Sequence, residues 1–162
     1  MLKGYKPCHQ LKILSNEHLS DVSFVLKTLR GETGNKRCKT AIPARKLILS
    51  ISSPVFLKMF HGKMEESSDS IELPDCEHDG LLEMLRYIYT DQANLTSDNV
   101  IQVLYLANKY VLNTLAEKCI EYLVNNLETL DAFFILKTAK MSGQKDLEEK
   151  CWEVIVTTQR KR

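Results

Sequence analysis

The sequence lacks most of the features that mark membrane, nucleic-acid-binding and secreted proteins. No apolar run in its 162 residues approaches the roughly 20 needed to span a bilayer, and residues 1–10 lack the apolar centre of a signal peptide. The 22 basic and 21 acidic residues leave a net charge of +1, which gives no broad positive field for a phosphate backbone. We therefore expect a soluble protein of the cytoplasm or nucleus that binds neither membrane nor nucleic acid.

Paired cysteines are also missing. The five cysteines are unevenly spaced with no C-x-x-C pair, which is typical of reduced thiols. Cys76 and His78 are close in sequence, but nothing follows that could complete a zinc site. As nucleophile and base they would still need an orienting group and an oxyanion site, so a surface turn is the simpler interpretation. With no P-loop, G-x-S-x-G or G-x-G-x-x-G motif present, we predict no metal, no cofactor and no catalytic residue.

The N-terminal part of the chain shows the alternation of a β-hairpin. Val22, Phe24 and Leu26 share one face with a period of two. Residues 30–36 contain the glycines of a turn, and the alternation returns over residues 38–42. Pro43 should end this second strand, because proline cannot donate a ladder hydrogen bond.

Helical spacing dominates the rest of the chain. Residues 44–51, with Leu47, Ile48 and Ile51 as the apolar stripe, and residues 54–60 predict two short helices. The second should be capped within Ser52-Ser53-Pro54, with the proline in its first turn, and closed by Gly62. An acidic loop then leads to a short strand at residues 71–73. Amphipathic helices are predicted at residues 79–89, 99–111 and 115–127, with Thr96, Ser97 and Asp98 as candidate caps.

The pattern begins again after residue 128. Asp131 should cap one helix, Ser142-Gly143 should break it, and a last helix should run through residues 147–155 as its antiparallel partner. Trp152 could be a binding residue, but the apolar stripe around it favours packing within the pair. The whole pattern predicts an α+β fold: a small, mostly antiparallel sheet packed by helices, followed by a C-terminal helical pair.

Several short matches, in order along the chain, carry a family resemblance. They are L-S-D-V at 19–22, I-P-A-R-K at 42–46, S-P-V-F at 53–56, I-E-L-P-D at 71–75 and L-R-Y-I-Y-T at 85–90. Together they resemble a BTB/POZ domain over residues 15–127. The segment K-C-W-E-V-I at 150–155 is similar to the start of a BACK domain, which implies that residues 128–162 are the N-terminal part of one.

The resemblance also implies a partner-binding surface. Met64-Glu65-Glu66 matches the pattern hydrophobic, any residue, Glu that many cullin-binding BTB proteins carry at this point. It implies that the N-terminal domain of cullin-3 is held by Met64, Glu66, Leu57, Lys58, Phe60 and Tyr110. From the residues alone, the 63–67 segment is a solvated acidic loop, Phe60 belongs to the core, and Tyr110 ends a packed helix.

The implied function is a homodimeric adapter that recruits an unknown protein substrate to a cullin-3 RING ubiquitin ligase. The alternative is a self-association scaffold in transcription or cytoskeletal organisation that does not bind cullin. Two features depart from the family. Arg45 stands where the family usually has the histidine of Ala-His-Lys, which adds a permanent charge. The segment before Asp21 is shorter than the long N-terminal helix that supports swapped dimers in some branches.

Overall fold

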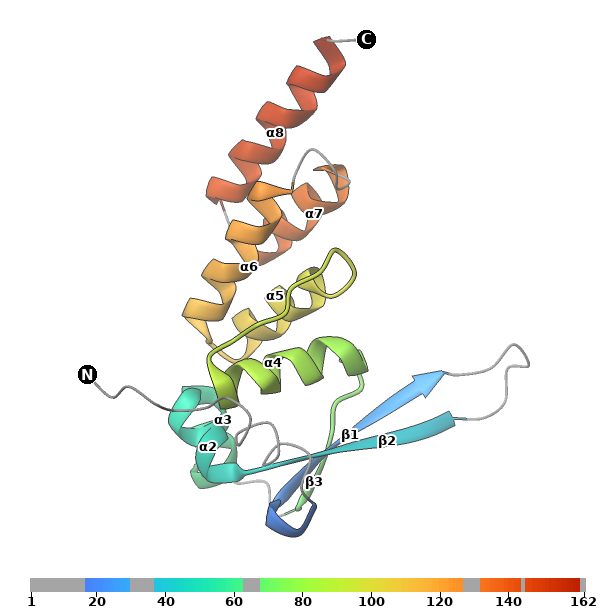
Figure 1. The fold of residues 1–162 in the computed structure, drawn as a ribbon, viewed down its shortest axis with the longest axis vertical. Coiled ribbons are helices and arrows are strands. Elements are labelled where there is room, and N and C mark those ends of the chain that lie inside the picture. Colours follow the sequence, from blue (N-terminus) through green and yellow to red (C-terminus); the bar gives the residue numbers. More distant parts are fainter. Residues whose placement is uncertain (1–16, 30–36, 63–67, 127–131, 144, 161–162) are drawn as a thin grey trace. The chain divides into compact units, whose positions relative to one another are not determined.

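The computed structural model describes residues 17–29, 37–62, 68–126, 132–143 and 145–160, and it packs as two units that divide after Asn94. The first unit begins with a short 3-10 helix, η1 (Glu17–Leu19), and contains a three-stranded sheet (Figure 1). Its strands are β1 (Val22–Leu29), β2 (Arg37–Ala44) and β3 (Ser70–Glu72), in the order β2-β1-β3. β1 pairs with β2 antiparallel and with β3 parallel. A small mixed sheet accompanied by helices confirms the predicted α+β class.

The hairpin follows the predicted alternation. Val22, Phe24 and Leu26 are buried, and Phe24 lies opposite Ile42. The prediction for Pro43 is wrong, because β2 continues through it to Ala44. Within the described strands β2 pairs only with β1, so it is an edge strand, where a proline without an N–H is tolerated.

Three helices accompany the sheet: α2 (Lys46–Ser52), α3 (Pro54–His61) and α4 (His78–Thr90). The start of α3 is as predicted, since Ser53 Oγ accepts hydrogen bonds from the N–H groups of Val55 and Phe56 at 3.2 and 3.3 Å, and Pro54 occupies the first turn. The helix ends at Gly62, where an added Cβ would lie 2.2 Å from the carbonyl oxygen of Lys58. Only glycine allows this close approach.

The second unit consists of α5 (Val100–Lys109), α6 (Asn113–Asn125), α7 (Ala132–Ser142) and α8 (Lys145–Arg160). All four match predicted helices, although Leu127 and the predicted cap Asp131 lie outside the described residues. α7 packs against α8, and Gly143 makes the turn between them with a φ of 67°. In the described part of the chain, no helix is both long enough and apolar enough to cross a membrane.

The prediction that Trp152 packs within the helical pair is confirmed only in part, because its ring lies beside Lys140 of α7 but the side chain is half exposed. Among the side chains of α8 that the structure describes, Leu147, Cys151 and Ile155 are buried, whereas Trp152 is 47% exposed. Each residue advances about 100° around an α-helix, so Trp152 lies one step beyond the buried stripe that contains Cys151.

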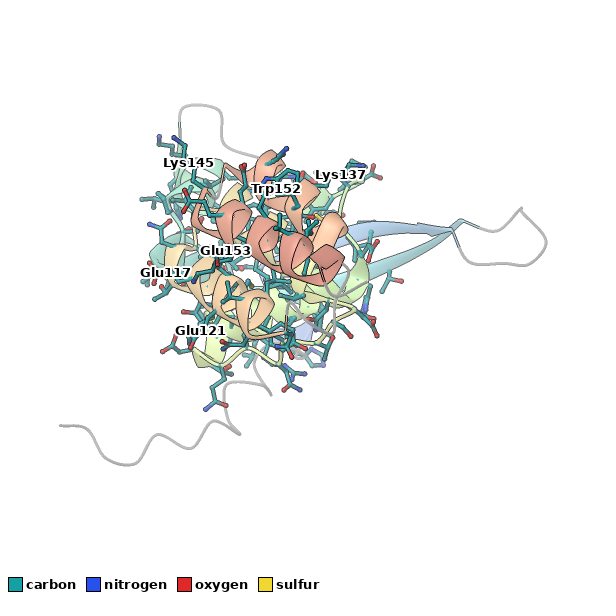
Figure 2. The ribbon with its side chains drawn as sticks, turned by 90° about the horizontal axis from the view of Figure 1, so that it is seen from above. Glu117, Glu121, Lys137, Lys145, Trp152 and Glu153 are labelled. Atoms are coloured by element: carbon teal, nitrogen blue, oxygen red, sulfur yellow. The ribbon has the colours of Figure 1, made fainter. Side chains whose placement is uncertain are left out.

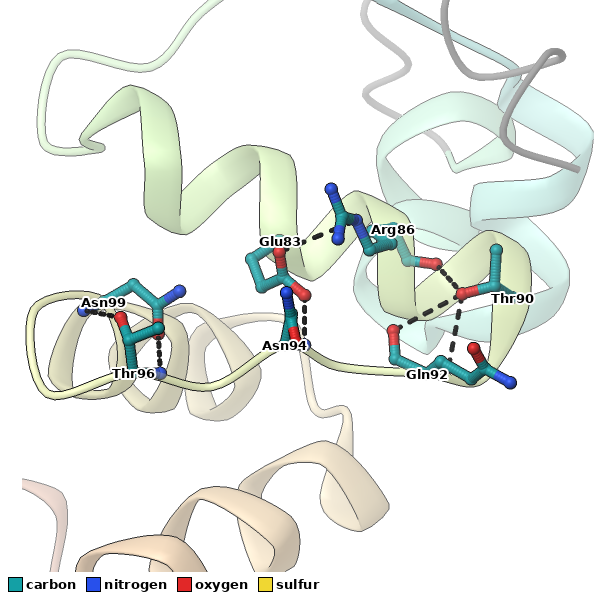
Figure 3. Close-up of polar contacts among 7 residues, drawn as sticks. All are labelled: Glu83, Arg86, Thr90, Gln92, Asn94, Thr96 and Asn99. Atoms are coloured by element: carbon teal, nitrogen blue, oxygen red, sulfur yellow. Dashed lines mark hydrogen bonds and ion pairs between the residues drawn. The ribbon is translucent and has the colours of Figure 1, made fainter. Parts of the chain in front are cut away.

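A polar network holds the segment that follows α4 (Figure 3). Asp91 ends the helix in the left-handed conformation, with a φ of 58°. The Thr90 hydroxyl bonds to the backbone of Arg86 and Gln92. The buried carboxylate of Glu83 accepts the backbone N–H of Asn94, and its second oxygen lies 3.6 Å from Nε of Arg86. The chain therefore leaves α4 along a path fixed by one buried acid.

A second set of bonds defines the start of α5. The N–H of Thr96 donates to Oδ1 of Asn99 at 2.9 Å, and the N–H of Asn99 donates back to Oγ1 of Thr96 at 3.3 Å. This reciprocal pairing resembles a capping box. Of the predicted caps, Thr96 therefore has a capping role, and Asp98 lies in the turn before Val100.

Candidate functional site

The outer face of α3 presents the described part of the predicted binding surface. Phe56 and Phe60 lie one turn apart and are buried, whereas Leu57 flanks this buried side and Lys58 lies farther round toward solvent. Leu57 is 48% exposed, and Lys58 and His61 are exposed beside it. The face therefore offers an apolar anchor flanked by basic groups, an arrangement suited to a protein partner.

Phe60 and Tyr110, also assigned to this surface by the resemblance, are core residues. Phe60 stacks on Phe56 with ring centroids 5.9 Å apart and an interplanar angle of 6°. Tyr110 belongs to the second unit, where it is buried at the C-terminal end of α5. Both side chains therefore support the fold beneath a surface, as the interpretation from the residues alone predicted.

Met64 and Glu66 fall in residues 63–67, outside the described residues, so their assignment stays a prediction. The chain directly after this segment is well anchored. The carbonyl of Asp69 accepts the N–H of Ser23 at 2.8 Å, and its carboxylate lies 2.9 Å from Nζ of Lys46. The same ammonium lies 6.0 Å from the ring centroid of Phe60, near the end of α3.

Arg45, the residue that departs from the family pattern, lies at the start of α2. Its backbone N–H donates to the phenol oxygen of Tyr89 at 2.9 Å, and burial raises the pKa of that phenol. The Nε of Arg45 is buried, with no hydrogen-bond partner among the described residues. The next N–H, that of Lys46, donates to Oδ1 of Asp21 at 2.7 Å. The start of α2 is therefore held to α4 and to the residue before β1 by backbone N–H groups and not by the arginine side chain.

The described cysteines show no nucleophilic arrangement. Burial raises the pKa of Cys119 to about 12, and burial together with the nearby Glu148 raises that of Cys151. Both thiols therefore stay protonated at neutral pH. Cys76 lies between β3 and α4, while Nδ1 of His78 is 2.9 Å from Oδ1 of Asp79. Within the described ranges, no three His, Cys, Asp or Glu side chains gather to hold a metal ion.

Two residues of the predicted apolar stripe of α2 face outward. Leu47 is 65% exposed and Ile51 is 78% exposed, while Leu49 and Ser50 are buried. Because residues i and i+4 share a helix face, Leu47 and Ile51 form one outward stripe. Their spacing signalled a helix correctly but could not tell which side faces the sheet.

A third exposed apolar site lies at the turn after α5. The N–H of Leu112 bonds to the carbonyl of Ala107 at 2.8 Å and that of Val111 to Asn108 at 3.2 Å, which is the Schellman pattern. Val111 occupies the left-handed position, with a φ of 55°, and its side chain is exposed. Glycine or asparagine is usual there, so a β-branched residue is a strained choice that no sequence signal indicated.

Comparison with known proteins gives one consistent result. The family model described as BTB/POZ domain matches residues 11–127. BTB/POZ domain-containing protein 6 of Homo sapiens is 36% identical over 143 residues, which cover 88% of this chain and 25% of that protein. BTB/POZ domain-containing protein 3 of Homo sapiens is also 36% identical, over 88% of this chain and 26% of its own length. The chain thus spans about a quarter of these curated relatives.

Proposed function

This chain belongs to the BTB/POZ domain family, whose members are typically non-enzymatic protein-interaction modules, and we propose that it recruits substrates to a cullin-3 RING ubiquitin ligase. In this role it makes and breaks no bond. It raises the effective concentration of a substrate near the ubiquitin-charged enzyme by holding both on one assembly.

The outer face of α3 carries the proposal. Leu57 and Lys58 project from a helix that is fixed at both ends, by the Ser53 cap and by the close approach at Gly62. A rigid helix with an exposed leucine can enter a groove between partner helices at little cost in conformational entropy. Met64 and Glu66, which follow closely in sequence, are proposed to extend the contact.

Binding of the purified chain to the N-terminal domain of cullin-3 tests this function. We expect Leu57→Asp to weaken binding by about 10- to 100-fold, because a buried carboxylate would replace an apolar anchor. Met64→Asp combined with Glu66→Lys should weaken it at least as much. Isothermal titration calorimetry measures each dissociation constant.

The matched control is Leu19→Asp, which changes a leucine of similar exposure on η1. It should leave cullin affinity within about twofold, since exposed positions outside an interface contribute little. The proposal fails if wild-type protein does not bind the cullin domain, or if Leu57→Asp and Leu19→Asp have equal effects.

The exposed stripe on α2 supports self-association, either in the same adapter or in a scaffold that does not bind cullin. Burying Leu47 and Ile51 against a second copy would contribute about 1.5–3 kcal/mol per side chain in each subunit. Because a two-fold axis places the same patch on both partners, an apolar stripe is self-complementary. We propose that α2 forms the core of a homodimer.

Light scattering over a dilution series tests the dimer. Wild-type protein should have twice the 18.6 kDa chain mass, and Leu47→Asp combined with Ile51→Asp should give the monomer mass. A wild-type mass that stays at that of the monomer contradicts the dimer. A dimer that does not bind the cullin domain supports the scaffold function instead.

We further propose that α7 and α8 begin a BACK domain, with its boundary after residue 127. We also propose that the protein works in the cytoplasm or nucleus. The helical pair supports the first point, because α7 and α8 pack on each other around Leu147, Cys151 and Ile155. The matches to the curated relatives cover 88% of the chain and so are longer than the residues matched by the BTB/POZ model. The substrate that such an adapter recruits is a protein.

A further inference from the structure

The outward side of α8 carries an exposed apolar pair. Trp152 and Val156 lie one helical turn apart and are exposed. Tryptophan is the residue type most enriched among the side chains that dominate protein interfaces. Its position just outside the buried stripe of α8 makes this pair available to a partner.

The neighbouring helix, α7, places positive charge along one side of this pair. Nζ of Lys140 lies 5.7 Å from the ring centroid of Trp152, and Lys137, one turn earlier on α7, is exposed. α7 contains no acidic residue. Lys145 begins α8 and is exposed as well. None of these three lysines forms an ion pair with a carboxylate in the described part of the chain.

Negative charge is concentrated on the α6 side of the pair. In Figure 2, Trp152 lies between Lys145 and Lys137 along one side of the view, and Glu153, Glu117 and Glu121 lie along the other. On α8 itself, Glu149 is exposed between Lys145 and Trp152. The apolar pair therefore has a purely basic flank on α7 and a mixed flank on α8.

We propose that this surface, which we call the Trp152 surface, binds an acidic amphipathic helix of a partner protein. Its members are Trp152, Val156, Lys137, Lys140 and Lys145. The apolar stripe of the partner covers Trp152 and Val156, and its carboxylates meet the α7 lysines. A second copy of this chain is the other possible occupant, and the measurement without peptide described below tests it. The inference does not depend on what α3 binds.

The single tryptophan provides the measurement, because the intrinsic tryptophan fluorescence of the chain comes from Trp152 alone. The probe is a synthetic helical peptide with leucines at i, i+3, i+4 and i+7 and glutamates along one flank. Its control has lysines in place of the glutamates. We expect the glutamate peptide to shift the emission to shorter wavelength and to bind at least about tenfold more tightly than the lysine peptide.

Variants locate the contact by anisotropy of a labelled glutamate peptide. Lys137→Glu combined with Lys140→Glu should abolish the preference for glutamate, and Trp152→Ala should weaken binding about tenfold or more. Glu117→Gln combined with Glu121→Gln, on the α6 side, should change nothing. The lysine pair is exposed, so it tests the proposal even if Trp152→Ala does not fold.

Three results would overturn the inference. They are an emission spectrum that the glutamate peptide does not change, equal affinity for both peptides, and an emission shift that depends on protein concentration without peptide. The last would show that a second copy covers Trp152.

Discussion

Replacing Phe56 with alanine is expected to lower the free energy of unfolding by about 3–5 kcal/mol. Phe56 is fully buried, and its ring centroid lies 5.8 Å from that of Phe24 on β1 and 5.9 Å from that of Phe60. The substitution would leave a cavity between the sheet and α3, and the surrounding aromatic rings could fill it only in part. Urea denaturation followed by circular dichroism measures the loss, because the single tryptophan reports only on the second unit.

The next residue along the helix supplies the control. Leu57→Ala removes an exposed side chain and should change stability by no more than about 0.5 kcal/mol. The order of the two variants should be reversed for cullin binding if α3 is the proposed surface. Phe56→Ala would leave the affinity of the folded fraction nearly intact, and Leu57→Ala would reduce it. Equal losses of stability would contradict the assignment of the two faces of α3.

The hairpin and α3 could be predicted from sequence because their signals are local. A period of two identifies the buried face of β1 without knowledge of its partner. The cap at Ser53 and the glycine after His61 mark both ends of α3 within ten residues. In each case the physical cause lies in neighbouring residues, so the local sequence is enough to predict the element.

Pro43, Leu47 and Trp152 show where local signals fail. Pro43 is compatible with a strand only because β2 lies at the edge of the sheet, and strand order depends on residues distant in sequence. Leu47 and Trp152 are apolar and lie at helical spacing, yet both are exposed. Spacing identifies a helix, but the face that is buried depends on what packs against it.

The candidate site divides in the same way. Exposure of Leu57 follows from its position beside Phe56 on a short amphipathic helix, so the sequence could predict it. The resemblance added Phe60 and Tyr110, which are both buried, because matching a motif does not separate contacting residues from supporting ones. The exposed Val111 at a left-handed position was not predicted, because a valine gives no sequence signal for a left-handed backbone conformation.

Glu83 is a buried acid on a helix whose other buried residues are mostly apolar. Its replacement gives the second large expected effect. Glu83→Ala should lower the free energy of unfolding by about 2–3 kcal/mol, because the N–H of Asn94 would lose a charged acceptor. Arg86 would lose its ion-pair partner as well, and its Nε, the atom that faces Glu83, is buried, although the rest of the side chain is partly exposed.

Glu83→Gln separates the two contributions. Glutamine keeps the volume and the oxygen that accepts from Asn94 but loses the charge that faces Arg86, so it should cost only about 1 kcal/mol. Hydrogen exchange at the Asn94 amide should therefore accelerate strongly in Glu83→Ala and weakly in Glu83→Gln. Equal exchange rates in the two variants would mean that the ion pair, and not the backbone hydrogen bond, fixes the chain after α4. The expected order instead means that Glu83 holds the chain after α4 by accepting the N–H of Asn94.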